Sequence, residues 1–182
     1  MVEVYISLGS NINPEKNILK AIGLLSDYVK ILDTSTVYRT EPIGTLSQHD
    51  FYNCVLRVET DAEPQRLKVN ILQSIENKMG RRGRHKYASR TIDLDILLYG
   101  KQNISTKDMT IPDPDIMTRP FLALALNELD PTLILPHTKQ SIKEVASQFK
   151  NYRKNPMKEY TNAVRDLIRN QKLRKQIEAR SK

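Results

Sequence analysis

The sequence predicts an α+β fold, a β-α-β-β-α-β unit followed by additional C-terminal helices. Two kinds of pattern support this class. Short runs that alternate apolar and polar residues, or that are rich in Val, Ile, Thr and Tyr, indicate strands. Apolar residues that recur every three or four positions indicate helices. Their order along the chain is strand, helix, strand, strand, helix, strand, which is typical of an antiparallel sheet covered by helices.

The first half of the unit begins with an alternating strand over residues 2–8, which the turn Gly9-Ser10-Asn11 ends. Asn13 is expected to cap a helix whose first residue is Pro14, because proline is favoured at that position. The apolar positions at helical spacing are Ile18, Ala21, Ile22 and Leu25. Residues 30–39 then predict a second strand.

The second half begins with a loop over residues 40–50 and a third strand over 51–60. Pro64 opens a helix, and Gly80 is placed to end it. The apolar face of this helix consists of Leu67, Ile71, Leu72, Ile75 and Met79. A basic loop leads to a fourth strand at 91–99. The whole is a ferredoxin-like arrangement of an antiparallel sheet with helices packed on it.

Three further helices are predicted after the unit. One spans about residues 119–129, and a second starts at Ser141, where Ser-Ile-Lys-Glu reads as a capping box. From Asn155 the tail has apolar residues at helical spacing and predicts an amphipathic helix. We therefore divide the chain into a domain over residues 1–149 and a basic, helical C-terminal extension over residues 150–182.

The net charge of +8 belongs to this extension. It holds 11 of the 29 Lys and Arg residues and 3 of the 21 Asp and Glu residues, which leaves 18 of each sign in residues 1–149. This removes the main argument for a general nucleic-acid role of the domain. A partner for the basic extension stays open: the extension could be a docking helix, a non-specific polyanion binder, or inert.

Cysteine use and hydropathy bear on the compartment. Cys54 alone cannot form an internal disulfide, and the strand-like N-terminus lacks the features of a signal peptide. No apolar run is long enough to span a membrane. We expect a cytoplasmic protein.

The strand Arg90–Tyr99 carries two acids in an apolar sequence. Asp93 and Asp95 share one face, with Cα atoms roughly 6 to 7 Å apart, because alternate side chains of a strand point the same way. The opposite face is expected to hold Ile92, Leu94, Ile96 and Leu98. Two adjacent carboxylates repel each other unless a cation lies between them, and Mg²⁺ prefers such ligands together with substrate phosphates. The alternative is the solvated face of an antiparallel sheet.

A basic loop without any acid precedes this strand. Its Lys and Arg residues are Lys78, Arg81, Arg82, Arg84, Lys86 and Arg90. Such a run is usually only solvated. Its position next to the two acids favours a second interpretation, a lid that closes over polyphosphate, because arginine suits bidentate phosphate contacts. Carboxylates alone would repel the anion that the arginines attract, and a metal–polyphosphate ligand satisfies both.

Other sites are not indicated. The chain has no Gly-rich P-loop motif, no nucleophile elbow, and no zinc-like spacing among His49, His85 and His137.

Several motifs occur together in a family-specific order: Leu8-Gly9-Ser10-Asn11, Tyr38-Arg39-Thr40-Glu41-Pro42-Ile43-Gly44, Phe51-Tyr52-Asn53, Gly80-Arg81, Arg90 to Gly100, Ile111-Pro112-Asp113-Pro114 and Arg119-Pro120-Phe121. With these motifs, residues 2 to 137 resemble the 6-hydroxymethyl-7,8-dihydropterin pyrophosphokinase family of folate biosynthesis. The resemblance implies transfer of pyrophosphate from ATP to the hydroxymethyl group of the pterin, leaving AMP. It also implies two Mg²⁺ ions on the triphosphate, held by Asp93 and Asp95.

The resemblance further implies roles for individual residues. The pterin ring would lie between Phe51 and Phe121, with Asn53 and the backbone at Thr40 and Ile43 along its polar edge. The nucleotide would be bound by Gln73, Glu76, Tyr87, Ile96, Thr110 and Arg119. The substrates would be bordered by Gly9, Ser10 and Asn11. Charge in the reaction would be neutralised by the catalytic set Arg81, Arg82, Arg84 and Arg90.

Three departures from the family pattern stand out. Where the family often has Trp-Gly-Pro-Arg before the strand, this chain has Tyr87-Ala88-Ser89-Arg90 in a loop one residue shorter, so the individual roles of Arg81, Arg82 and Arg84 stay open. Asp113 occupies a position where the family commonly has His, and an ionised Asp cannot donate to a phosphate. The basic extension has no counterpart in the compact family form, so we expect deletion after Phe149 to leave catalysis largely intact.

A non-catalytic regulatory or RNA-binding module is the alternative function, because the same order of elements serves both. An RNA-binding version should carry stacked aromatic residues in a characteristic strand, and residues 51–60 lack that pattern.

Overall fold

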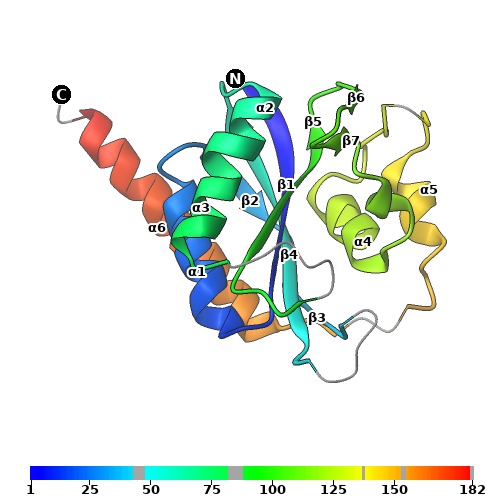
Figure 1. Cartoon of the computed structure of the whole chain (residues 1–182), viewed down its shortest axis with the longest axis horizontal. Coiled ribbons are helices and arrows are strands. Elements are labelled where there is room, and N and C mark those ends of the chain that lie inside the picture. The colour runs from blue at the N-terminus through cyan, green and yellow to red at the C-terminus, as the bar shows by residue number, and fades with distance from the viewer. Residues whose placement is uncertain (43–47, 82–87, 137, 153–154, 181–182) are drawn as a thin grey trace.

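The computed structural model describes residues 1–42, 48–81, 88–136, 138–152 and 155–180. Its centre is a five-stranded antiparallel sheet (Figure 1). The strands are β1 (Val2–Ser10), β2 (Lys30–Thr34), β3 (Tyr38–Thr40), β4 (Phe51–Thr60) and β5 (Asp93–Tyr99). Their order is β2-β4-β1-β5, and β3 pairs with the part of β4 that β2 does not reach. The predicted strand 30–39 is thus interrupted between β2 and β3. At this break the hydroxyl of Ser35, in place of a backbone carbonyl, accepts the backbone N–H of Val55 at 2.9 Å.

Helices cover both faces of the sheet (Figure 1). One face carries α1 (Pro14–Leu25), α2 (Pro64–Arg66), the π-helix η1 (Leu67–Leu72), α3 (Gln73–Lys78) and α6 (Lys158–Arg180). The other carries the 3₁₀ helix η2 (Pro114–Met117), α4 (Pro120–Leu129) and α5 (Ile142–Ser147). A small hairpin, β6 (Ile104–Ser105) and β7 (Thr110–Ile111), lies beyond β5. Each face has its own apolar cluster. None of the helices in the described part of the chain combines the length and apolar character needed to cross a membrane.

The helix predicted from Pro64 to Gly80 forms, but its middle is a π-helical turn. The N–H of Gln73 bonds to the carbonyl of Lys68, five residues back. The predicted end is confirmed: Gly80 adopts φ 80°, which a glycine tolerates, and the N–H of Arg81 bonds to the Glu76 carbonyl at 3.0 Å. This turn directs Arg81 back toward the sheet.

Of the two predicted caps, one is confirmed. Ser141 and Glu144 form the complete capping box of α5. Pro14 is the first residue of α1 as expected, but Asn13 makes no side-chain cap bond and lies in the left-handed region at φ 43°. Instead the Asn17 amide donates to the Ile12 carbonyl at 2.6 Å.

Strand β5 contains a bulge that the alternation rule does not anticipate. Tyr5 is opposite Leu98, yet its neighbour Ile6 is opposite Ile96. Because of this extra residue, Leu97 and Leu98 both pack in the cluster under α4 and α5. The expectation that Leu98 shares a face with Ile96 is therefore wrong. The acid-bearing face of β5 leads directly into an apolar core.

Candidate active site

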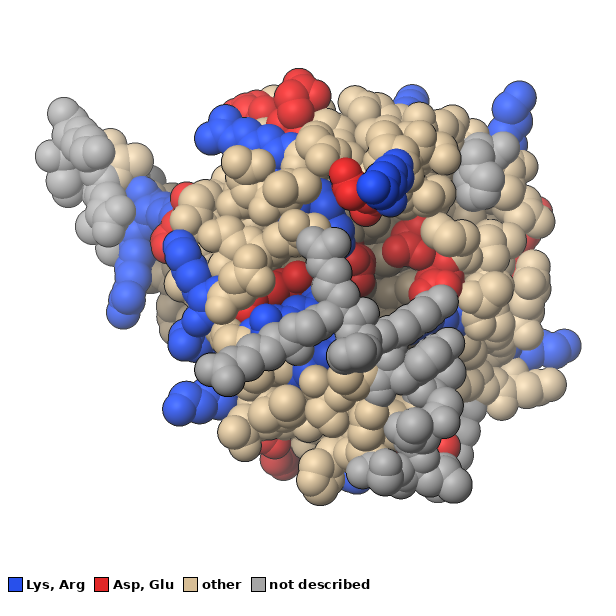
Figure 2. Space-filling view, in the orientation of Figure 1, with Lys and Arg blue, Asp and Glu red and all other residues tan. Residues whose placement is uncertain are grey.

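A pocket of about 920 Å³ lies where β1, β4 and β5 meet the start of α4. In Figure 2, Asp and Glu side chains are visible inside the hollow of this face, with Lys and Arg around them. The pocket brings together residues that are distant in the sequence. Its walls include Gly9, Thr40, Phe51, Asn53, Arg90, Asp93, Asp95, Asp113, Arg119 and Phe121. All ten come from motifs singled out in the sequence.

Both acids of β5 line the pocket, and each is paired with a basic side chain. Arg81 Nη1 lies 2.6 Å from Asp93 Oδ1, and Arg90 Nη1 binds the other oxygen of the same carboxylate. Lys68 Nζ lies 2.6 Å from Asp95 Oδ1. The interpretation of this pair as a solvated face does not hold for Asp93, which is only 18% exposed, whereas Asp95 is 43% exposed. Three protein cations surround two carboxylates, as expected where a charged ligand exchanges with them.

The donor set fits a cation that obtains most of its ligands from a substrate. Asp93 and Asp95 supply hard oxygen donors from one strand. Among the described residues, no group of three or more His, Cys, Asp or Glu side chains could hold a metal by itself. Mg²⁺ is usually bound in this way, by one or two carboxylates plus phosphate oxygens.

Arg81 is held in place by Glu76. The Glu76 carboxylate is buried, accepts the backbone N–H of Leu94 at 2.8 Å and pairs with Arg81. Burial raises the pKa of Glu76, while the Leu94 N–H and the Arg81 guanidinium act in the opposite direction. This side chain thus joins α3 to β5 and is not part of the pocket wall.

Lys68, which the sequence did not indicate, is not among the wall residues but pairs with Asp95 of the pocket. It belongs to η1, and its side chain is 14% exposed. Its ammonium also donates to the Leu94 carbonyl at 3.2 Å. A regular helix pattern gives no sign of a π-helical turn, although such turns occur frequently at functional sites.

A second group of residues in the pocket combines two aromatic rings with an amide. Phe51 and Phe121 both line it, together with Asn53, whose Nδ2 donates to Thr40 Oγ1 at 2.7 Å. Gly9 is needed next to this amide, since a Cβ there would lie 2.7 Å from Asn53 Oδ1. The rings, the amide and Gly9 form a slot suited to a flat polar ring.

Strand β1 continues to Ser10, so the turn predicted at Gly9-Ser10-Asn11 is wrong for its first two residues. Ser10 and Asn11 support the site from outside the pocket wall. Asn11 Oδ1 accepts the backbone N–H of Arg90 at 2.7 Å, and Ser10 Oγ donates to the Thr91 carbonyl at 2.7 Å. These bonds fix the start of the acidic strand.

The residues assigned to the nucleotide divide into three groups. Arg119 lines the pocket and pairs with Asp115 at 2.8 Å. The side chains that are not among the wall residues of the described pocket are Gln73, Glu76, Ile96 and Thr110. Ile96 in particular is 4% exposed within the core. The third nucleotide residue group is Tyr87 alone, which lies outside the described residues. Also outside them lie Ile43, assigned to the pterin edge, and Arg82 and Arg84 of the catalytic set.

Asp113 lines the pocket as an ionisable group with a shifted pKa. Burial, opposed by the Asp115 backbone N–H, raises its pKa from 3.8 to about 6. Its side chain also caps η2, since Oδ1 accepts that N–H at 2.8 Å. Asp113 therefore gains a proton more readily than an ordinary aspartate, and the protonated form can donate a hydrogen bond.

Replacing Asp113 by Asn should stabilise the protein at pH 7.5. The folded state holds the proton up to about pH 6, whereas the unfolded chain releases it near 3.8, so the ionised carboxylate lowers stability above pH 6. Asn keeps the capping oxygen without the charge, and we expect a gain of roughly 1 to 2 kcal/mol. The gain should shrink as the pH falls through 6 toward 4. Denaturant unfolding at pH 7.5 and at pH 4 measures the gain in the free energy of unfolding. Asp27→Asn, at an exposed position, is the control. A pH-independent difference would contradict this account.

The chain is similar in sequence to proteins of one known family. The family model described as 7,8-dihydro-6-hydroxymethylpterin-pyrophosphokinase matches residues 5–131. A 2-amino-4-hydroxy-6-hydroxymethyldihydropteridine pyrophosphokinase of Haemophilus influenzae is 40% identical over 157 residues, covering 84% of this chain and 96% of that protein. One of Aquifex aeolicus is 39% identical over 145 residues, covering 79% and 90%.

Solved structures show a similar fold. A Plasmodium falciparum HPPK-DHPS structure has a TM-score of 0.66 at 16% identity and covers 83% of this chain. A further HPPK-DHPS structure in complex with substrates has a TM-score of 0.65 and covers 82%. This chain spans less than half of each of those longer proteins, 47% and 44% respectively.

Proposed function

The chain belongs to the 7,8-dihydro-6-hydroxymethylpterin-pyrophosphokinase family, and on that premise we propose that it transfers pyrophosphate from ATP to the hydroxymethyl group of 6-hydroxymethyl-7,8-dihydropterin. AMP and the pterin diphosphate are the products, in folate biosynthesis. The observation that carries this proposal is one pocket with a paired-acid end and an aromatic–amide end.

At the acidic end, Asp93 and Asp95 would hold Mg²⁺ on the triphosphate. When bound, two Mg²⁺ ions would compensate phosphate charge and orient the triphosphate. Arg81 and Arg90 lie on Asp93 in the ligand-free protein and can turn from that carboxylate to phosphate oxygens. Lys68 can make the same exchange from Asp95. Each exchange replaces one charge pair by another, so no buried cation is left without a partner.

At the other end, the pterin ring would stack between Phe51 and Phe121. Asn53 and the backbone at Thr40 would bond its polar edge. A site that pairs the edge of the ring discriminates strongly against analogues that leave its polar groups unpaired. A ring bound there would direct its hydroxymethyl group toward Asp93 and Asp95, which line the same pocket.

The hydroxyl oxygen of the pterin attacks the β-phosphorus in line. The bond between that phosphorus and the oxygen bridging to the α-phosphate breaks, AMP leaves with the electron pair of that bond, and the proton of the attacking hydroxyl passes to water. The protein contributes positioning and charge stabilisation to such a transfer, since little covalent work falls to side chains. Arg119 on the pocket wall is a further cation for the nucleotide.

We also infer that the sheet is ferredoxin-like. The strand order β2-β4-β1-β5 with antiparallel neighbours supports it, because a β-α-β-β-α-β chain gives this order when each helix crosses between non-adjacent strands.

The purified protein should release AMP from ATP only when both Mg²⁺ and the hydroxymethyl dihydropterin are present. Chromatography of the nucleotides measures AMP, and pterin diphosphate should appear in equal amount. Reactions without pterin or with a chelator are the controls. ATP binding with no turnover would favour a regulatory module instead, and ADP as the product would mean transfer of the γ-phosphate alone and would contradict pyrophosphate transfer.

A further inference from the structure

The C-terminal extension reaches the proposed pterin end of the pocket. Tyr152 and Asn155 line the same pocket as Thr40, Phe51 and Phe121. Both lie beyond residue 131, where the match to the family model stops. The extension therefore contributes to a wall that the family motifs do not specify.

Tyr152 is held from the side of α5. Its backbone N–H donates to the Phe149 carbonyl at 2.9 Å, and Phe149 packs on the same apolar cluster as Phe121. The ring is half-buried. Burial, with a smaller contribution from the Glu41 carboxylate, raises the pKa of Tyr152, so the phenol stays neutral. The neutral ring of Tyr152 thus lines the pocket, although this residue belongs to the C-terminal extension.

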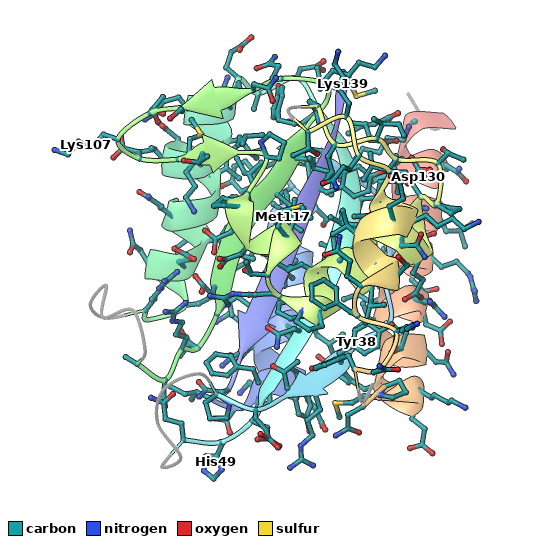
Figure 3. The ribbon with its side chains drawn as sticks, turned by 90° about the vertical axis from the view of Figure 1, so that its right-hand side faces the viewer. Tyr38, His49, Lys107, Met117, Asp130 and Lys139 are labelled. Carbon is teal, nitrogen blue, oxygen red and sulfur yellow. The ribbon has the colours of Figure 1, made fainter. Side chains whose placement is uncertain are left out.

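The segment that follows is bonded to the edge strand that carries Thr40. The Arg39 N–H donates to the Asn155 carbonyl at 2.9 Å, and the Met157 N–H donates to the Val37 carbonyl at 2.8 Å. Tyr38 and Pro156 form a β-bridge between these two bonds. Figure 3 shows Tyr38 at this edge of the sheet, beside the first turns of α6. The extension therefore continues the sheet past β3.

We propose that Tyr152 is a substrate-binding residue whose ring contacts the pterin, and that the extension thereby completes the ring-binding end of the pocket. The inference rests on the proposed function. A third aromatic side chain beside Phe51 and Phe121 adds apolar contact for a flat heterocycle and excludes water from its edge. In the proposed function the triphosphate is bound on the side of Asp93 and Asp95, so Tyr152 should act on the pterin only.

Replacing Tyr152 by Ala should raise both the KM and the dissociation constant for the pterin by roughly 10-fold, the effect of losing one aromatic contact. The KM for ATP should change less than about twofold, as one ring contact affects only the substrate it touches. Tyr152→Phe should behave like the wild type, because it retains the ring. Tyr28→Ala removes an exposed tyrosine far from this pocket and is the matched control. Pterin fluorescence titration gives binding without turnover, and melting curves check folding.

Three results would overturn the inference. The first is pterin binding by Tyr152→Ala equal to the wild type, and the second is a loss in Tyr152→Phe as large as in Tyr152→Ala. A raised ATP KM in parallel with the pterin KM would also contradict it, since a distorted fold affects both substrates. Failure of the proposed function is a separate result. In that case the wild type itself binds no pterin or makes no AMP.

Discussion

Asp95→Asn should lower kcat by about 10³-fold or more, equivalent to at least about 4 kcal/mol of transition-state stabilisation. Asn has nearly the same shape as Asp but carries no charge, so it is a poor ligand for a hard cation. Asp95 lies on the pocket wall and is paired with Lys68 at 2.6 Å. The loss should therefore be chemical rather than structural.

The stability of Asp95→Asn distinguishes a chemical loss of activity from a structural one. Asp95 is 43% exposed, and Lys68 keeps a bond to the Leu94 carbonyl when the carboxylate is removed. Breaking such a half-exposed ion pair should cost less than about 1 kcal/mol. Melting temperature and steady-state AMP release measure the two effects. Asp166→Asn, on the exposed side of α6, is the matched control for the loss of one carboxylate. Turnover near the wild-type rate in Asp95→Asn would rule out the metal role of this residue.

The positions of Asp93, Asp95 and Gly80 could be predicted from the sequence, because they depend on the conformation of neighbouring residues. Alternation along a strand places Asp93 and Asp95 on one face, and the structure puts both in one pocket. Gly80 ends its helix because it alone among neighbouring residues adopts a positive φ without strain. Both rules depend only on adjacent residues, which a sequence displays directly.

The features that sequence reasoning missed arise from non-local or irregular geometry. The helix that carries Lys68 contains a π-helical turn, and the strand that carries Leu98 contains a β-bulge that moves this side chain to the face covered by α4 and α5. Each feature adds one residue to an otherwise regular element. No residue type marks such an insertion. The position of Tyr152 depends on how α5 packs on the sheet, which no local pattern encodes. For that reason the extension looked separable from the domain.

Deletion of residues 150–182 should therefore destabilise the protein severely, contrary to the expectation from sequence. In helix α6, Val164 is completely buried and Ile168 is 4% exposed. Both belong to the apolar cluster on the face of the sheet that α1 and α3 also cover. Tyr160 packs against Tyr52 with ring centroids 5.9 Å apart. Losing the burial of these three side chains should cost roughly 4 to 8 kcal/mol. Total stability of a domain is about 5 to 15 kcal/mol, so much of the truncated chain should be unfolded.

A graded series makes the outcome interpretable even if the truncated chain cannot be purified. Deletion of residues 176–182 begins after Lys175, the last described residue with a hydrogen bond to the body, and should change the unfolding free energy by less than about 1 kcal/mol. Ile168→Ala should cost about 2 to 4 kcal/mol by leaving a cavity between α6 and the sheet. Denaturant unfolding measures both. A truncated protein as stable as the full chain would mean that α6 rests on the domain without supporting it. In the structure, though, the extension also bonds the edge of β3 through Asn155 and Met157, so its removal exposes backbone as well as apolar surface.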